Sequence, residues 1–156
     1  MTPRITVPGQ LVNSAVGRVH ITRYPGTITL EVAQASQADY IEHCRRIGSE
    51  RSPVLLIFEK PLPLPPVEIR SYWREVTVTP GFEAVAVIMT GVVGLMAATA
   101  THLGEQLVAV LGVHFRSFKT SDEASQWLTS VCDCQVDEFD LMDVADAVLA
   151  IDPNGG

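Results

Sequence analysis

The thiols are the side chains of this chain best suited to chemistry, and Cys132 and Cys134 are separated by a single residue. Two thiolates at that spacing could bind a soft metal ion or form a redox pair. A closed metal site needs more ligands, and the histidines at positions 20, 43, 102 and 114 show no ligand spacing with the cysteines. Cys44 leaves an odd number of cysteines, which argues against a disulfide framework. We therefore interpret the pair as small residues after a helix and predict no metal site.

The sequence also shows no group of residues spaced for acid–base or nucleophilic catalysis. Glu59, Glu83 and Glu105 are candidate general bases, but nothing in their spacing brings two of them together. No G-x-S-x-G motif supplies a nucleophile for a Ser-His-Asp triad. Residues 90–94 read T-G-V-V-G, which lacks the third glycine and the lysine of phosphate-binding loops and is better read as a tight turn. We predict no catalytic residue and no cofactor.

Length and charge restrict the class of protein further. The 156 residues suit one domain, and 47% hydrophobic with 19% charged residues is a globular composition. Seven of the 18 acidic residues lie in residues 132–156, which contain no Lys or Arg. Residues 1–131 are therefore neutral, with 11 acidic and 11 basic residues. A nucleic-acid partner is not expected, because such proteins concentrate positive charge on one face.

The distribution of apolar residues argues against secretion and against a membrane span. The first ten residues lack the apolar run of a secretory signal, so we expect a cytoplasmic protein. Apolar residues crowd positions 84–113, but glycines, His102 and Glu105 interrupt them. A buried strand followed by a buried helix explains this stretch better than a span of about 20 residues does.

Residues 19–24 and 27–32 alternate between apolar and polar side chains and contain many β-branched residues, so they predict a hairpin around Pro25 and Gly26. A helix is expected next, with Ser36 as its N-cap and its end near Gly48. The remaining chain alternates short apolar runs with helical patterns. Strands are expected at residues 53–58, 84–89 and 113–118. Three further helices are expected: one that begins at Pro66, one within residues 92–111 and one that follows Thr120. This order predicts an α/β fold with a mixed, mainly parallel sheet and crossover helices.

Residues 114–128 carry the clearest local signal. Thr120 and Glu123 form a T-x-x-E capping box at the start of a helix. Apolar residues then recur at helical spacing, namely Ala124, Trp127, Leu128 and Val131. The sequence predicts a strand that leads directly into a capped helix with one apolar face.

The phrase at residues 118–128, together with the order of elements over about residues 18–131, resembles the STAS-like domains of bacterial anti-sigma-factor antagonists. The resemblance implies a single α/β domain, here residues 1–131, that acts by binding another protein. It also implies a phosphorylatable hydroxyl in the loop between the third strand and the second helix. That loop, residues 59–66, contains no Ser or Thr, so the switch residue is not carried over.

Two segments outside the resemblance are candidates for protein contact. The first is the proline-rich connector 60–66, where Leu62, Leu64 and Pro66 either present a stiff apolar surface or cover the edge of the sheet. The second is the acidic segment 132–156, in which a helix is expected over 138–151. Its apolar candidates are Phe139, Leu141, Val144, Val148 and Ile151. This helix either packs on the body of the same chain or docks on a partner or a second copy.

We expect a non-enzymatic regulatory or scaffolding module that binds another protein or forms a homo-oligomer, without nucleic acid or membrane. A membrane surface is a poor target because amphipathic membrane helices are usually basic. The alternative is a small-molecule or lipid-binding module whose apolar pocket is lined by the helix within residues 92–111.

Overall fold

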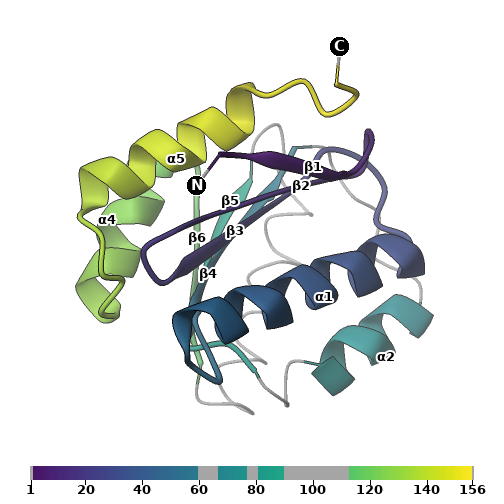
Figure 1. Ribbon diagram of the computed structural model, residues 1–156, viewed down its shortest axis with the longest axis horizontal. Coiled ribbons are helices and arrows are strands. Elements are labelled where there is room, and N and C mark those ends of the chain that lie inside the picture. Colours follow the sequence, from purple (N-terminus) through teal and green to yellow (C-terminus); the bar gives the residue numbers. More distant parts are fainter. Residues whose placement is uncertain (1, 60–66, 77–80, 90–112, 156) are drawn as a thin grey trace.

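The computed structural model describes residues 2–59, 67–76, 81–89 and 113–155. These residues form one six-stranded mixed sheet with helices on both faces (Figure 1). The strands lie in the order β1-β2-β3-β4-β5-β6, so neighbours in the sheet are also neighbours along the chain. The α/β class predicted from the sequence is confirmed.

The sheet changes from antiparallel to parallel at its third strand. β1 to β3 form an antiparallel meander, and β3 to β6 run parallel to one another. The strands are β1 (Arg4–Val7), β2 (Leu11–Val16), β3 (Val19–Tyr24), β4 (Pro53–Phe58), β5 (Ala84–Met89) and β6 (His114–Phe118). The predictions of strands at 53–58, 84–89 and 113–118 are confirmed to within one residue.

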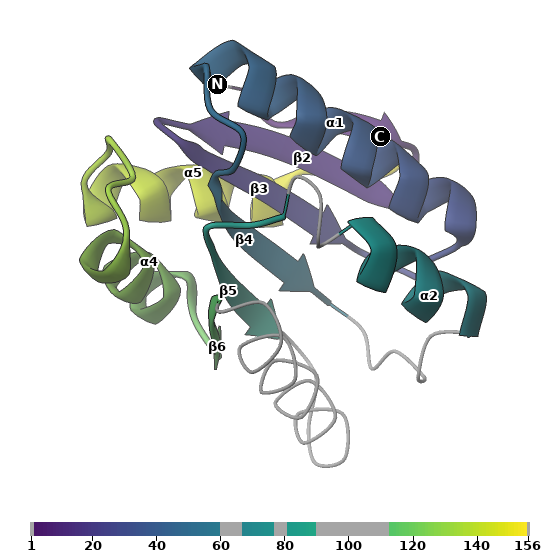
Figure 2. The same ribbon diagram turned by 90° about the horizontal axis from the view of Figure 1, so that it is seen from below.

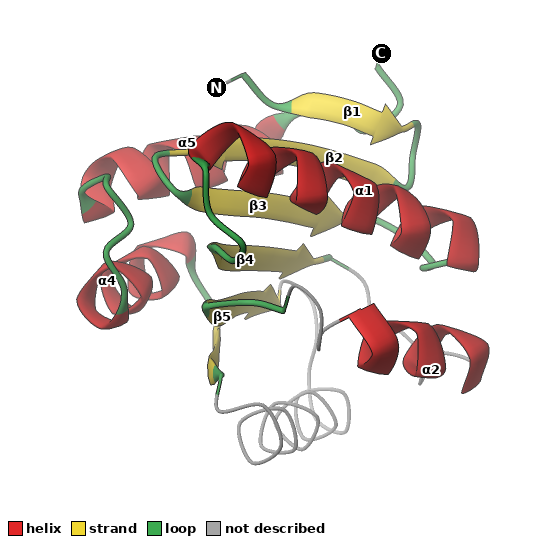
Figure 3. Ribbon diagram, turned by 60° about the horizontal axis from the view of Figure 1, so that its bottom comes forward, coloured by secondary structure: helices red, strands yellow, loops and turns green. Residues whose placement is uncertain are grey.

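Four described helices cover the sheet in two pairs. They are α1 (Leu30–Ile47), α2 (Val67–Val76), α4 (Ser121–Val131) and α5 (Glu138–Ala150). Helices α1 and α2 lie on one face, whereas α4 and α5 lie on the other (Figure 3). Among the described helices, none combines the length and the apolar composition that a membrane span needs.

The hairpin predicted from residues 19–24 and 27–32 is wrong in its second strand. β3 pairs with the preceding β2, and α1 already begins at Leu30. Thr29 is its N-cap, because the Thr29 hydroxyl accepts a hydrogen bond from the Val32 N–H at 3.2 Å. Alternation over residues 27–32 fits a strand, but burial of the helix face that includes Val32 and Ala33 favours the helix instead.

The N-cap predicted at Ser36 is also wrong, since Ser36 lies within α1 and its hydroxyl accepts a hydrogen bond from Tyr24 at 2.9 Å. The predicted end of the helix is confirmed. Gly48 has φ 68° and its N–H bonds to the carbonyls of the last turn, as a left-handed C-cap does. The sheet also begins earlier than the expected core start at residue 18, because β1 and β2 precede that position.

Alternate residues of each central strand point to opposite faces of the sheet, and both faces are apolar. In β4, Leu55 and Ile57 contribute to the core beneath α4 and α5. Val54 and Leu56 contribute to the clusters on the opposite face. A strand buried on both sides has the continuously apolar sequence that predicted β4.

The helix α4 confirms the capping prediction at Thr120, whose hydroxyl accepts a hydrogen bond from the Glu123 N–H at 3.3 Å. Leu128 is fully buried in the core under the sheet. Trp127 is half-buried, and its ring lies 5.6 Å from that of Phe118 in β6. The aromatic contact fixes α4 against the end of the sheet.

The C-terminal helix α5 packs on the body of the same chain. Leu141, Ala145 and Val148 are fully buried in the core that α5 shares with α4, β2 and β3. Phe139 lies at the start of this helix with 65% of its surface exposed. The expected helix over 138–151 is therefore present, and most of its apolar face is used within the chain.

Replacing Leu141 by Ala should lower the free energy of unfolding by about 2–5 kcal/mol, because it leaves a cavity in a fully buried site. Chemical denaturation followed by circular dichroism measures this. Phe139→Ala is the matched control from the same helix and should leave the midpoint unchanged. Equal midpoints for the Leu141 variant and the unsubstituted chain would contradict the packing of α5.

Candidate functional site

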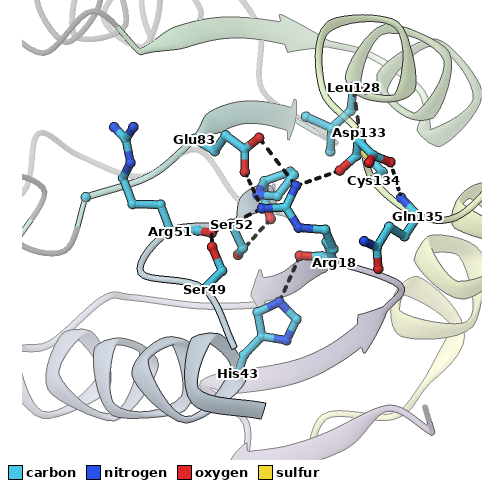
Figure 4. A network of polar contacts seen from close by, with 12 residues as sticks. Arg18, His43, Ser49, Arg51, Ser52, Glu83, Leu128, Asp133, Cys134 and Gln135 are labelled. Carbon is cyan, nitrogen blue, oxygen red and sulfur yellow. Dashed lines mark hydrogen bonds and ion pairs between the residues drawn. The ribbon is translucent and has the colours of Figure 1, made fainter. Parts of the chain in front are cut away.

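Arg18 is the centre of a polar network at one end of the sheet (Figure 4). It lies in the turn between β2 and β3. Its guanidinium donates to Glu83 Oε2 at 2.8 Å and to the Asp133 carbonyl at 2.7 Å. The hydrogen bond with Glu83 raises the pKa of Arg18. On the other side, the Arg18 carbonyl accepts a hydrogen bond from His43 Nε2 at 2.9 Å. One residue thus joins the turn to α1, to the start of β5 and to the α4–α5 loop.

This network lies at the amino-terminal ends of the parallel strands, since Ser52 precedes β4 and Glu83 precedes β5. Tyr40 of α1 strengthens it by donating to the Gly81 carbonyl at 2.8 Å and accepting from the Ser52 N–H at 2.9 Å. Open α/β sheets bind ligands at the carboxyl ends of their strands. The Arg18 network lies at the opposite end of the strands, where it holds loops together.

The two cysteines lie beside this network, Cys132 half-buried and Cys134 buried. Burial raises the pKa of Cys132 to about 11 and that of Cys134 to about 12. Cys134 Sγ lies 3.5 Å from the Leu128 carbonyl, to which it donates. At neutral pH both groups are protonated, whereas metal binding and thiol exchange need the thiolate. Within the described residues, no three His, Cys, Asp or Glu side chains come together as a metal ion would require.

A second polar cluster lies between β3 and α1. His20 Nε2 donates to Asp39 Oδ2 at 2.8 Å, and the Thr22 hydroxyl lies 3.3 Å from His20 Nδ1 and can donate to it. Asp39 also forms an ion pair with Arg4 of β1. Hydroxyl, imidazole and carboxylate stand in the order that a nucleophilic triad uses. The sequence reasoning missed this cluster, although His20 and Thr22 alternate on one strand face and Asp39 and His43 are one helical turn apart.

This arrangement is closed to a substrate and is poorly suited to proton transfer. His20 and Thr22 are each only 1% exposed beneath α1. Burial, together with the nearby positive charge of His43, Arg46 and Arg4, lowers the pKa of His20 to about 3. A catalytic base works best with a pKa near the working pH. The cluster therefore connects α1 to β3 and, through Arg4, to the edge strand β1.

A third set of polar contacts fixes the end of α5. Arg23 of β3 is buried, and its Nη1 donates to the carbonyls of Val148 at 2.8 Å and Ile151 at 2.7 Å. Its Nε lies 2.6 Å from Glu59 Oε1 in an ion pair. A cation is favourable at a helix C-terminus because the last carbonyls lack partners. Glu59 and Glu83, two of the candidate bases, are thus both engaged with arginines, and Glu105 lies outside the described residues.

The predicted contact residues fall into three groups. Leu62, Leu64 and Pro66 lie outside the described residues, as does the expected helix within 92–111. Leu141 and Val148 are fully buried, whereas Val144 and Ile151 are half-buried against the same core. Phe139 alone among the candidates on α5 is exposed. A role for these residues in binding a partner stays a prediction.

No protein-family model, no curated protein and no solved structure matches this chain.

Gly17 precedes Arg18 in the turn, and its close approach to the α4–α5 loop can be tested by substitution. Gly17 has φ +54°, and a Cβ there would lie 2.4 Å from the Cys134 carbonyl oxygen. Gly17→Ala should therefore cost roughly 3 kcal/mol of stability or more. Gly48→Ala is the control, because it has a similar φ but nothing within 4 Å, and should cost about 1 kcal/mol. Equal denaturation midpoints for the two variants would show that the Gly17 contact is absent.

The buried His20 ring predicts a loss of stability in mild acid. Its pKa is about 3 in the folded chain and about 6.5 when unfolded, so the unfolded chain binds the proton first as pH falls. The contribution of His20 to the free energy of unfolding should be fully present above about pH 6.5. Below that pH it should decline, by about 2 kcal/mol at pH 5. Urea midpoints at pH 7 and pH 5 measure the change. The decline should be smaller in His20→Gln, and identical midpoints in the unsubstituted chain would contradict a buried neutral ring.

Proposed function

We propose that this protein is a non-enzymatic regulatory or scaffolding module of the cytoplasm, with a STAS-like fold, that works by binding another protein. The proposal rests on the contrast between side chains that are engaged inside the fold and one that is exposed. Those with chemical potential, such as Arg18, His20 and Arg23, are engaged in holding helices and loops to the sheet. A large aromatic side chain, Phe139, stays exposed at the start of α5.

The STAS-like assignment is supported by the arrangement of the elements. Parallel strands alternate with helices after an antiparallel start, and the last strand leads into the helix capped by Thr120. These are the features on which the resemblance in sequence rests. Since residues 59–66 contain no hydroxyl side chain, regulation in this protein works through contact surfaces and not through the phosphorylated loop of the better-known members.

Phe139 is the best-placed anchor for such a contact. Exposure of a Phe side chain to water is unfavourable, and aromatic residues are enriched at interfaces because they bury a large area at little entropic cost. In the sequence, Phe139 is preceded by the N-cap Asp137 and by Glu138 and is followed by Asp140, so its neighbours along the chain are acidic. A partner would offer an apolar pocket with basic groups at its rim.

The test compares capture of a partner by the tagged full chain and by two variants in lysate of the source cells. Phe139→Ala should reduce recovery of a specific partner at least about ten-fold, which corresponds to about 1.4 kcal/mol. It should leave the urea midpoint unchanged. Ile41→Ala removes another exposed apolar side chain, from α1, and should keep the partner.

Capture of no specific partner, or equal recovery by both variants, would contradict the proposal. A small molecule retained by the purified chain in native mass spectrometry, without any protein partner, would favour the ligand-binding alternative.

A further inference from the structure

The two edges of the sheet are protected to very different degrees. β1 has a register shift between Ile5 and Val7, and its Arg4 is tied to Asp39 of α1. The turn after β1 is also fastened to the C-terminal tail, since the Gly9 N–H bonds to the Pro153 carbonyl at 2.8 Å. Bulges and covering segments are the usual means of protecting an edge strand. β1 is thus unsuited to accept a further strand.

β6 lies at the other end of the sheet and has none of these protections in the described part of the chain (Figure 2). It pairs with β5 in unbroken register from His114 to Phe118. No described strand pairs with its outer side. A regular edge strand presents a row of backbone N–H and C=O groups to which an extended segment can add.

The side chains of β6 indicate what kind of segment would add there. His114 and Arg116 are exposed, and they point to the same face because they are two residues apart in a strand. Lys119 is exposed directly after the strand. None of these three side chains pairs with a carboxylate among the described residues. In a chain of net charge −7, Arg116 and Lys119 make this edge a local basic strip.

The strip is held in place by the aromatic contact with α4. The Arg116 guanidinium lies over the Phe118 ring at 5.6 Å, and Phe118 packs on Trp127. A guanidinium supported by a ring loses less freedom when it binds a carboxylate. On the opposite face of the strand, Phe115 is half-buried among apolar residues. An added segment would therefore meet basic groups on one face and apolar groups on the other.

We propose that the outer edge of β6 binds an extended acidic segment of the partner protein, with acidic residues at alternate positions and apolar or small residues between them. The inference rests on the proposed function, protein–protein contact, and adds a second surface to that of Phe139. A second copy of the chain is a poor occupant. Antiparallel pairing of β6 about a two-fold axis at Arg116 would place two like charges directly opposite each other.

The experiment follows backbone amide signals of the isotope-labelled full chain by NMR. The probe is a synthetic capped peptide, Glu-Val-Glu-Thr-Glu-Val, and its counterpart with Lys in place of each Glu. The acidic peptide should shift the amide signals of residues 113–119 and slow their hydrogen exchange at least about ten-fold, whereas the basic peptide should not. Phe139→Ala should bind the acidic peptide normally, which separates this surface from the one in the proposed function.

Charge-reversal variants decide whether β6 is responsible. Arg116→Glu should weaken binding of the acidic peptide at least about ten-fold and admit the basic one. Arg116→Lys should retain binding. As a control, Arg45→Glu reverses an exposed charge on α1, an element distant in sequence from β6. This variant should bind the acidic peptide as the unsubstituted chain does. If Arg116→Glu fails to fold, Arg116→Gln replaces it with the same expected loss.

Several results would overturn the inference. They are an absence of shifts at β6, equal shifts with both peptides, or undiminished binding by the Arg116 variants. Exchange at β6 that slows with rising protein concentration alone would assign the edge to a second copy instead. Failure of the peptide experiment leaves the Phe139 capture result intact, so the two proposals fail separately.

Discussion

The sheet must be covered on both faces, and the rest of the structure depends on that constraint. β4 is apolar at Val54 and Leu56 on one face and at Leu55 and Ile57 on the other. Each fully buried side chain of this kind contributes about 1.5–3 kcal/mol relative to exposure, so neither face can be left to water. Helices α1 and α2 cover one face, and α4 with α5 cover the other. The acidic C-terminal helix is therefore part of the fold, although its composition sets it apart in the sequence.

Covering both faces also encloses polar groups. Several of them bond to a neighbouring element, whereas Asn13 Oδ1 and Ser125 Oγ are buried without a hydrogen-bond partner among the described residues. Arg18, His20 and Arg23 come from β3 or the turn before it, and each reaches a different helix or loop. Loss of a hydrogen-bond partner at a buried polar group is unfavourable, so these contacts help to hold α1 and α5 in place. The two binding surfaces proposed above, at Phe139 and along β6, lie outside these contacts.

Local signals in the sequence were sufficient where a residue acts on its own neighbours. Thr120 and Gly48 were recognised because a cap is a contact within a few residues. The strands β4 and β5 were recognised because burial on both faces leaves a continuous apolar run. The strand predicted at residues 27–32 is wrong because alternation there fits a strand equally well. The helix α1 forms instead because Thr29 caps it and its apolar face is buried against the sheet. β2 was missed because its central polar residues, Asn13 and Ser14, hide a buried strand.

The sequence by itself determined the α/β class, the central strands and the caps of two helices, since these follow from composition, period and contacts between near neighbours. The tertiary structure alone decided the rest. Leu141 and Val148 could equally have faced a partner, and only the position of α5 over β2 and β3 shows that they complete the core. Likewise, His20 and Asp39 are 19 residues apart. Their contact exists only because α1 crosses β3, a relation between distant segments that no local pattern encodes.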